Sequence, residues 1–155
     1  MSEKRSYESA EFTNMCMLER EDGKILVINR TDPDWSGLAF PGGHVEVGES
    51  FVDSCVREMK EETGLTVLDP VICGLKQFYK KDGARYVIFL FKATKYCGEL
   101  KSSDEGEVFF IDRDEIECYK QTMHFDSLLR VFDDEKTSEF QYIREDDGSY
   151  RLLLH

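Results

Sequence analysis

Runs of apolar residues predict a chain built mainly from strands. Two short runs, residues 14–18 and 24–29, are joined by Glu21-Asp22-Gly23, and a glycine that adopts positive φ favours a hairpin at this point. A later pair of runs covers residues 71–80 and 86–93. The second of these is apolar enough to be buried on both faces, which predicts a central strand. Further strands are predicted at 107–111 and in a final hairpin of 139–144 with 149–154.

Apolar residues at helical spacing predict two helices. Between Phe125 and Phe132 they recur at i, i+3, i+4 and i+7, which predicts an amphipathic helix that covers a sheet. A second helix is predicted at about 51–63, because Ser50 and Asp53 form a capping-box-like start and Gly64 is a suitable stop.

The helix at 51–63 carries an apolar stripe and an acidic arc side by side. The stripe consists of Val52, Cys55, Val56 and Met59. At about 100° per residue, Glu58, Glu61 and Glu62 fall within one arc of about 100° next to that stripe. Three carboxylates are therefore expected to share one side of the helix.

Composition and charge narrow the class of protein. The chain has 155 residues, 41% of them hydrophobic, which predicts a single domain over residues 1–155 with a sizeable core. Its formal net charge of −12 opposes binding to nucleic acid polymers or anionic membranes. An acidic protein that binds a polyphosphate therefore needs a bridging cation.

The pattern of cysteines and the N-terminal residues indicate a cellular location. The five cysteines include no C-x-x-C pair, and the first residues lack the apolar stretch of a secretory signal. No run of residues is long and apolar enough to be expected to span a membrane. A cytoplasmic protein without a membrane partner is expected.

The acidic arc has two interpretations. Most acidic clusters are solvated helix faces. Alternatively, Glu58 and Glu62, one turn apart, bind a divalent cation that offsets their mutual repulsion, and Mg²⁺ prefers such hard oxygen ligands. The preceding Gly42 and Gly43 let backbone groups approach a ligand or ion, so a carbonyl there can complete the coordination. Arg57 lies outside the arc and is expected to pair with Glu49 or to steady a glutamate.

A longer pattern favours the second interpretation. Residues 43–65 fit G-x5-E-x7-R-E-U-x-E-E-x-G-U, in which U is aliphatic or Met. A chance match in a chain of this composition is on the order of one in a million. The pattern positions are filled by Gly43, Glu49, Arg57, Glu58, Met59, Glu61, Glu62, Gly64 and Leu65.

This segment resembles the Nudix box, and its lead-in, Leu38-Ala39-Phe40-Pro41-Gly42-Gly43, resembles that of the MutT-type members. The resemblance implies an α/β (α+β) fold, a Nudix-type α/β/α sandwich with a mixed sheet between helices. It also implies a hydrolase that cleaves a diphosphate bond in nucleotides with Mg²⁺ or Mn²⁺.

Site residues follow from the same resemblance. Glu58 and Glu62 would be direct metal ligands, Glu61 a ligand or a support, and the Gly42 carbonyl a backbone ligand. Glu49 and Arg57 would orient them. A further glutamate from a later loop is expected within 103–107, where Glu105 is preferred to Glu107 because it precedes a flexible glycine.

Three residues are candidates for substrate binding. Arg30, just before a loop, would contact phosphate, although an exposed surface arginine fits equally well. Phe40 would stack on a base, although a phenylalanine before a turn more often packs in a core. Gly43 would allow close approach of the substrate. Trp35, in the loop after the second strand, is a further candidate for contact with the ligand.

The leading functional prediction is a MutT-like nucleoside triphosphate pyrophosphohydrolase that releases a nucleoside monophosphate and pyrophosphate. Oxidised guanine nucleotides such as 8-oxo-dGTP are plausible substrates. The alternatives are an ADP-ribose or nucleotide-sugar pyrophosphatase and a non-catalytic nucleotide-binding module. Glu61, Glu58 and Glu105 all remain candidates for the general base. A monomer or a homodimer is expected.

Overall fold

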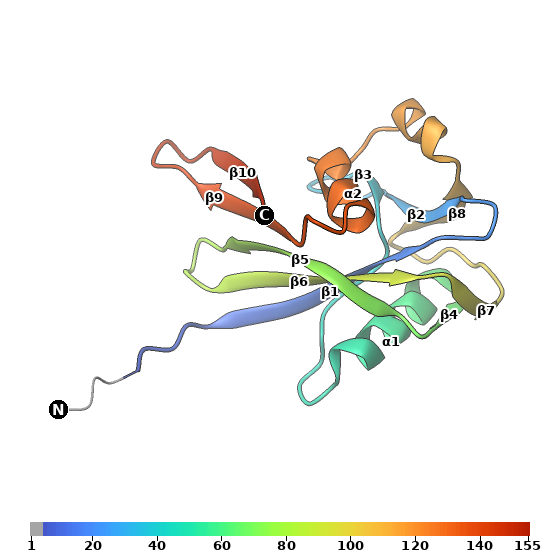
Figure 1. The fold of residues 1–155 in the computed structure, drawn as a ribbon, viewed down its shortest axis with the longest axis horizontal. Helices are drawn as coiled ribbons and strands as arrows, with labels where there is room; N and C mark the ends of the chain where they lie inside the picture. The colour runs from blue at the N-terminus through green and yellow to red at the C-terminus, as the bar shows by residue number, and fades with distance from the viewer. Residues whose placement is uncertain (1–4) are drawn as a thin grey trace.

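The computed structural model describes residues 5–155 and contains ten strands and three helices (Figure 1). The strands are β1 (Ala10–Leu18), β2 (Ile25–Arg30), β3 (Gly37–Ala39), β4 (Leu65–Leu68), β5 (Val71–Tyr79), β6 (Arg85–Ala93), β7 (Lys95–Gly98), β8 (Gly106–Ile111), β9 (Glu139–Arg144) and β10 (Tyr150–Leu154). The helices are α1 (Phe51–Thr63), the 3₁₀-helix η1 (Arg113–Cys118) and α2 (Phe125–Asp133).

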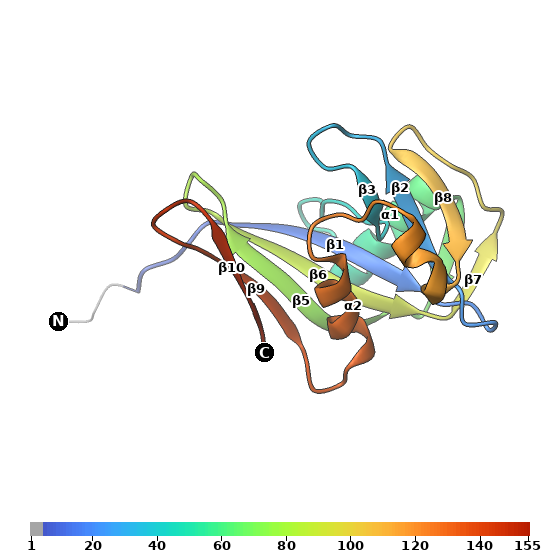
Figure 2. The same ribbon diagram turned by 90° about the horizontal axis from the view of Figure 1, so that it is seen from above.

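Three sheets organise the strands. A five-stranded mixed sheet has the order β1-β6-β5-β9-β10, in which β1 pairs with β6 and β5 with β9 in parallel. An antiparallel sheet has the order β3-β2-β8, and β4 pairs with β7. Figure 2 shows α2 between the β9–β10 hairpin and the three-stranded sheet. No helix among residues 5–155 is both long enough and apolar enough to cross a membrane.

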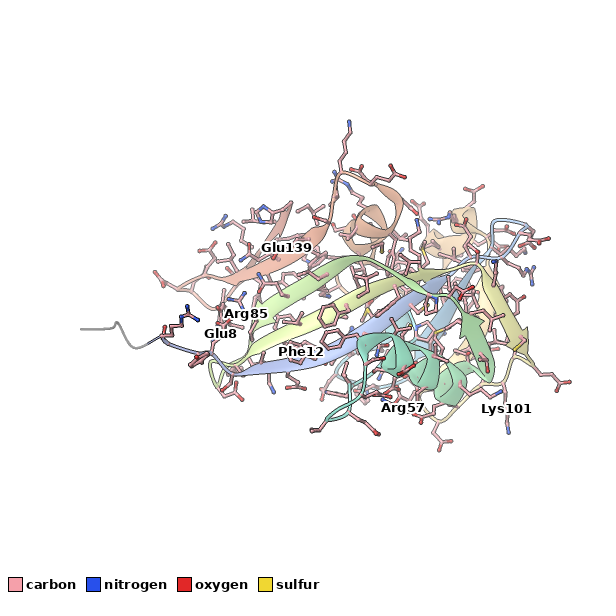
Figure 3. All side chains as sticks on the ribbon, turned by 60° about the horizontal axis from the view of Figure 1, so that its bottom comes forward. Glu8, Phe12, Arg57, Arg85, Lys101 and Glu139 are labelled. Carbon is pink, nitrogen blue, oxygen red and sulfur yellow. The ribbon has the colours of Figure 1, made fainter. Side chains whose placement is uncertain are left out.

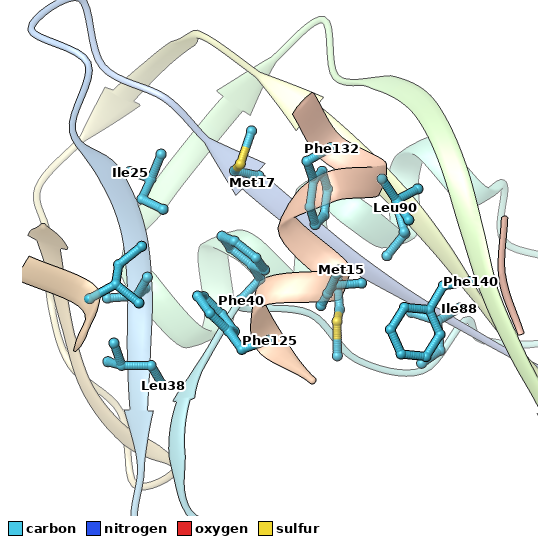
Figure 4. Close-up of a cluster of buried hydrophobic side chains, with 14 of the residues drawn as sticks. Met15, Met17, Ile25, Leu38, Phe40, Ile88, Leu90, Phe125, Phe132 and Phe140 are labelled. Atoms are coloured by element: carbon cyan, nitrogen blue, oxygen red, sulfur yellow. The ribbon is translucent and has the colours of Figure 1, made fainter. Parts of the chain in front are cut away.

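The two helices cover opposite faces of the five-stranded sheet, which confirms the predicted mixed sheet between helices. Alternate residues of β1 point to opposite sides: Met15 and Met17 belong to the cluster that contains α2, whereas Cys16 and Leu18 pack with α1. Figure 4 shows the first cluster, in which Phe40 and Phe132 lie close to Met17. The predicted central strand is also confirmed, because β6 lies between β1 and β5.

The predicted hairpin at residues 14–29 is wrong in one respect. The tight turn forms, with Gly23 at φ 84° and the Arg20 amide donating to Lys24. The strands then diverge into different sheets and share only a bridge between Glu19 and Ile25. Residues 13–18 and 25–28 are all buried, so each strand needs cover on both faces, and packing of the two strands against each other and against α1 and α2 supplies it.

Helix α1 has the predicted bounds, but its buried face is shifted. The Ser50 side chain accepts from the Asp53 amide, and Gly64 ends the helix at φ 75°. Val52, predicted to be in the apolar stripe, is 43% exposed, whereas Glu62 is only 5% exposed. The buried face of α1 is therefore rotated toward Glu62, compared with the face that the apolar stripe predicts.

Candidate active site

Glu62 lies at the contact between α1 and the loop that precedes it. Its Oε2 accepts from the Gly42 amide at 3.0 Å. Burial raises the pKa of Glu62 well above the usual range, and the nearby Glu105 carboxylate raises it further, although the bond from Gly42 opposes the shift. A buried carboxylate in this environment is stabilised as an anion by a nearby positive charge.

Positions 42 and 43 require glycine, because other groups of the protein lie where a Cβ atom would be. The carbonyls of Pro41 and Gly43 accept from the β1 amides of Cys16 and Asn14, at 2.9 Å each, which holds this loop against β1. A Cβ at Gly42 would lie 2.0 Å from the Asn14 carbonyl oxygen, and one at Gly43 would lie 2.4 Å from the Glu58 carboxylate carbon. The loop therefore brings backbone groups directly onto the acidic side of α1.

Arg57, labelled on α1 in Figure 3, connects acidic residues of α1 with the loop before the helix. Its guanidinium donates to both carboxylate oxygens of Glu49, at 2.8 and 2.9 Å, and to Glu58 at 2.9 Å. A further bond of 3.2 Å reaches Glu61. This bidentate pairing holds the pKa of Glu49 at about 2, and its geometry fits the predicted orienting role of Arg57 and Glu49.

Glu105 reaches the same place from the loop before β8. Its Oε2 accepts from Arg30 Nη1 at 2.9 Å. Burial raises the pKa of Glu58, and both Glu61 and Glu105 raise it further against the effect of Arg57. Both Glu105 and Glu107 are exposed, but only Glu105 lines the adjoining cavity, so the geometry favours Glu105 as the additional glutamate.

The donor groups suit a hard divalent cation. The Glu105 carboxylate raises the pKa of both Glu58 and Glu62, and within residues 5–155 no hydrogen bond is donated to the Gly42 carbonyl. The same residues contain no group of three or more His, Cys, Asp or Glu side chains already gathered as a metal site. Arg57 is paired with Glu58, and Arg30 is paired with Glu105.

A cavity of about 450 Å³ adjoins these carboxylates. Gly42, Gly43, Arg30 and Glu105 line it beside α1, and Trp35 lies with its ring 4.5 Å from the Arg30 guanidinium carbon. The remaining wall is largely aromatic and includes Phe78, Tyr86, Tyr142 and Tyr150. Among the described residues, Arg30 Nε and Asn14 Oδ1 are buried without a hydrogen-bond partner, and both residues line this cavity.

The sequence allows two roles for Phe40, stacking on a base and packing in the core, and its position in the structure favours packing. Its side chain is 2% exposed and stacks on Phe125 with ring centroids 5.0 Å apart. A second ring, Phe132, meets it at an interplanar angle of 62° with centroids 4.9 Å apart, although Phe40 also contributes to the cavity wall. The geometry therefore favours a structural role for Phe40.

Sequence analysis missed most of the cavity wall. Asn14, Lys76, Tyr86 and Tyr142 lie on four different strands, and sheet pairing brings them together. For example, Lys76 is in register with Phe140 although 64 positions separate them in the chain. No short sequence motif indicates that residues from distant strands lie side by side.

Residues 13–145 match the NUDIX domain family, and the chain therefore belongs to the Nudix hydrolases. The chain is 35% identical over 107 residues to the Nudix hydrolase YvcI of Bacillus subtilis and 39% identical over 95 residues to the ADP-ribose pyrophosphatase of Methanocaldococcus jannaschii. These matches cover 66% and 59% of this chain and 66% and 56% of the lengths of those two relatives.

A solved structure of a MutT protein from Bacillus halodurans has the same fold. It superposes with a TM-score of 0.69 at 27% sequence identity, covering 92% of this chain and 97% of the other. The chain is accordingly a MutT-like member of a hydrolase family that acts on nucleoside diphosphate-linked substrates and generally uses divalent metal ions.

Proposed function

We propose that the protein is a Mg²⁺-dependent nucleoside triphosphate pyrophosphohydrolase of MutT type, with oxidised guanine nucleotides such as 8-oxo-dGTP among its substrates. One observation supports this most directly. A single cavity is lined by the Glu105 carboxylate and by Gly42 and Gly43, which contact Glu62 and Glu58, and aromatic rings form much of its remaining wall. This arrangement suits a ligand with a phosphate chain at one end and a planar base at the other.

The positions of the side chains assign the binding roles. Glu58, Glu62 and the Gly42 carbonyl would hold Mg²⁺, with Glu61 as a ligand or a support. The bound cation would polarise phosphoryl oxygens and neutralise charge that develops on the leaving phosphate. Arg57 and Glu49 keep Glu58 oriented, and Gly43 leaves space for the Glu58 carboxylate. Arg30, whose Nε lacks a partner, would donate to a phosphate oxygen.

The hydrolytic step needs a proton acceptor. Water attacks one phosphorus, the bond from that phosphorus to the bridging oxygen breaks, and the proton released by the water passes to a carboxylate. Each of the three candidates is paired with an arginine, Glu58 and Glu61 with Arg57 and Glu105 with Arg30, and only Glu105 lines the cavity. We therefore assign Glu105 as the general base in this proposal.

A substrate panel with product analysis tests the function. With Mg²⁺ and nucleoside triphosphates that include 8-oxo-dGTP, we expect equal amounts of nucleoside monophosphate and pyrophosphate. Release of inorganic phosphate with a nucleoside diphosphate would contradict the proposed reaction. Turnover of unmodified dGTP at the rate of 8-oxo-dGTP would contradict the proposed preference.

A second candidate is hydrolysis of ADP-ribose, which the 39% identity to an ADP-ribose pyrophosphatase favours. The same substrate panel distinguishes this reaction from hydrolysis of a nucleoside triphosphate, because ADP-ribose would give AMP and ribose 5-phosphate. A nucleotide-binding module without turnover is the third possibility. The presence of every carboxylate of the box, Glu49, Glu58, Glu61 and Glu62, argues against it.

A further inference from the structure

Lys76 places a positive charge in the aromatic part of the cavity. It lies in the middle of β5, beside β9, and its Nζ is 4.7 Å from the ring centroid of Phe140 and 5.1 Å from that of Tyr142. Among the hydrogen bonds and ion pairs of residues 5–155, none involves the Lys76 ammonium. Its only close partners are therefore two aromatic rings.

Burying an unpaired ammonium at this position costs free energy, and packing against the neighbouring rings does not require a charged side chain. Burial lowers the pKa of Lys76 to about 8, because the surrounding protein disfavours the charged form. Contact with two rings offsets part of that cost. A methionine or leucine would pack against Phe140 and Tyr142 without desolvating a charge. The fold thus gains nothing evident from a lysine here, which directs attention to the cavity that Lys76 lines.

The surroundings define what the ammonium can bind. An ammonium offers three donors and no acceptor, so its partner must be an acceptor. Phe78, Tyr86 and Tyr142 present flat apolar surface beside it, which suits a planar ring. A phosphate fits poorly there, because a doubly charged group would lose its water among aromatic rings for one cation. The second cation of the cavity, Arg30, is paired with Glu105 near the carboxylates.

We propose that Lys76 is a specificity-determining residue that donates a hydrogen bond to a keto oxygen of the substrate's base. This proposal rests on the proposed function, because it assumes that a nucleotide occupies the cavity with its phosphates toward Glu58, Glu62 and Glu105. It implies a preference for bases that carry a keto oxygen over those that carry an amino group at the same ring position. An amino group would present donors to a donor and leave the ammonium unpaired.

Two matched pairs of nucleotides test the preference. ITP and ATP differ in a keto oxygen or an amino group at position 6 of the purine, and UTP and CTP differ in the same way at position 4 of the pyrimidine. A hydrogen bond to a charged group predicts that the wild-type protein prefers the keto member of at least one pair by about tenfold or more in kcat/KM. In Lys76→Met that ratio is expected to fall to near one.

Lys80→Met is the matched control. Lys80 follows β5 directly, its side chain is 38% exposed and pairs with Glu11, and it does not line the cavity. The control should keep the wild-type ratio, because it removes the same charge outside the cavity. A wild-type ratio near one for both pairs, or an unchanged ratio in Lys76→Met, would overturn the proposal. Urea unfolding of Lys76→Met should show a free energy of unfolding at least equal to that of the wild type.

Binding measurements separate this proposal from the proposed function. Calorimetric titration with IMP against AMP and UMP against CMP requires no turnover. Preference for a keto base that disappears in Lys76→Met supports the role of Lys76 even in a protein that hydrolyses nothing, and such a protein would refute only the proposed function. Hydrolysis without any such preference would refute only the role of Lys76.

Discussion

Arg30 Nη1 donates to Glu105 Oε2 at 2.9 Å and so joins the end of β2 to the loop before β8, 75 positions away in the sequence. The same guanidinium lies against the Trp35 ring, and its Nε is buried without a hydrogen-bond partner. Arg30 thus connects the acidic side of the site with the part that would receive substrate. Its geometry favours the phosphate-binding role over that of a surface arginine, because its side chain is 15% exposed.

Replacement of Arg30 should weaken substrate binding more than it slows turnover. In Arg30→Ala we expect KM to rise about tenfold or more, because a charge-assisted bond to phosphate is lost. Arg30→Lys should recover part of the loss, since it keeps the charge but not the planar fork. Steady-state kinetics with a nucleoside triphosphate checks both, and an unchanged KM in Arg30→Ala would exclude the role.

Glu58→Gln and Glu62→Gln should remove most turnover and preserve folding. Each change removes the charge of a proposed metal ligand, and we expect kcat to fall on the order of a hundredfold. Folding should persist because Gln fills nearly the same volume, and Glu62 is buried with a raised pKa. Asp53→Asn on the exposed first turn of α1 is the control. Wild-type rates in both Gln variants would defeat the assignment of these ligands.

Chelation should stop activity without unfolding α1. The helix is anchored by Cys55 and Met59, both 0% exposed, which pack with Leu18 and Leu65. EDTA is therefore expected to abolish turnover while far-ultraviolet circular dichroism stays constant, and added Mg²⁺ should restore the rate. Loss of helical signal on chelation would instead indicate a structural ion.

The pairing of Glu49 with Arg57 should be visible in acid stability. Because the folded-state pKa of Glu49 is lowered from 4.5 to about 2, its stabilising effect is complete above pH 4.5 and is lost as the pH falls toward 2. Urea unfolding at pH 6 and pH 3 should show a steeper loss of stability in the wild type than in Glu49→Gln. Equal losses in the two proteins would mean that this pair does not stabilise the fold.

The two adjacent glycines should respond differently to alanine. In Gly42→Ala the new Cβ meets a backbone oxygen of β1, so we expect a loss of about 2 kcal/mol or more in the free energy of unfolding. In Gly43→Ala the Cβ meets only the end of the Glu58 side chain, which can move. Folding should survive there while kcat falls about tenfold or more. Calorimetry and kinetics on both variants check this contrast, and a Gly43→Ala protein with full activity would show that the position of Glu58 is not critical.

The bounds of α1 and its acidic side can be predicted from the sequence, because they depend on residues that are close together in the chain. The Ser50 cap, the Gly64 stop and the spacing of the glutamates are properties of consecutive residues, and the structure has the helix at 51–63 as predicted. The short strands β3, β4 and β7, of three or four residues, were not predicted, because so few positions establish no period. The exposure of Val52 was also missed, since amphipathic spacing does not specify how far a helix face is rotated against its sheet.

The sequence alone determined that this chain carries the box of a Nudix hydrolase, because those residues lie within one helix and the loop before it. Only the tertiary structure decided that β1 and β2 part into separate sheets and that Phe40 faces the core. It also decided that Lys76 meets Phe140 and Tyr142 inside a cavity. Pairing between distant strands depends on the burial of whole surfaces, and that is a property of the folded chain rather than of any short segment.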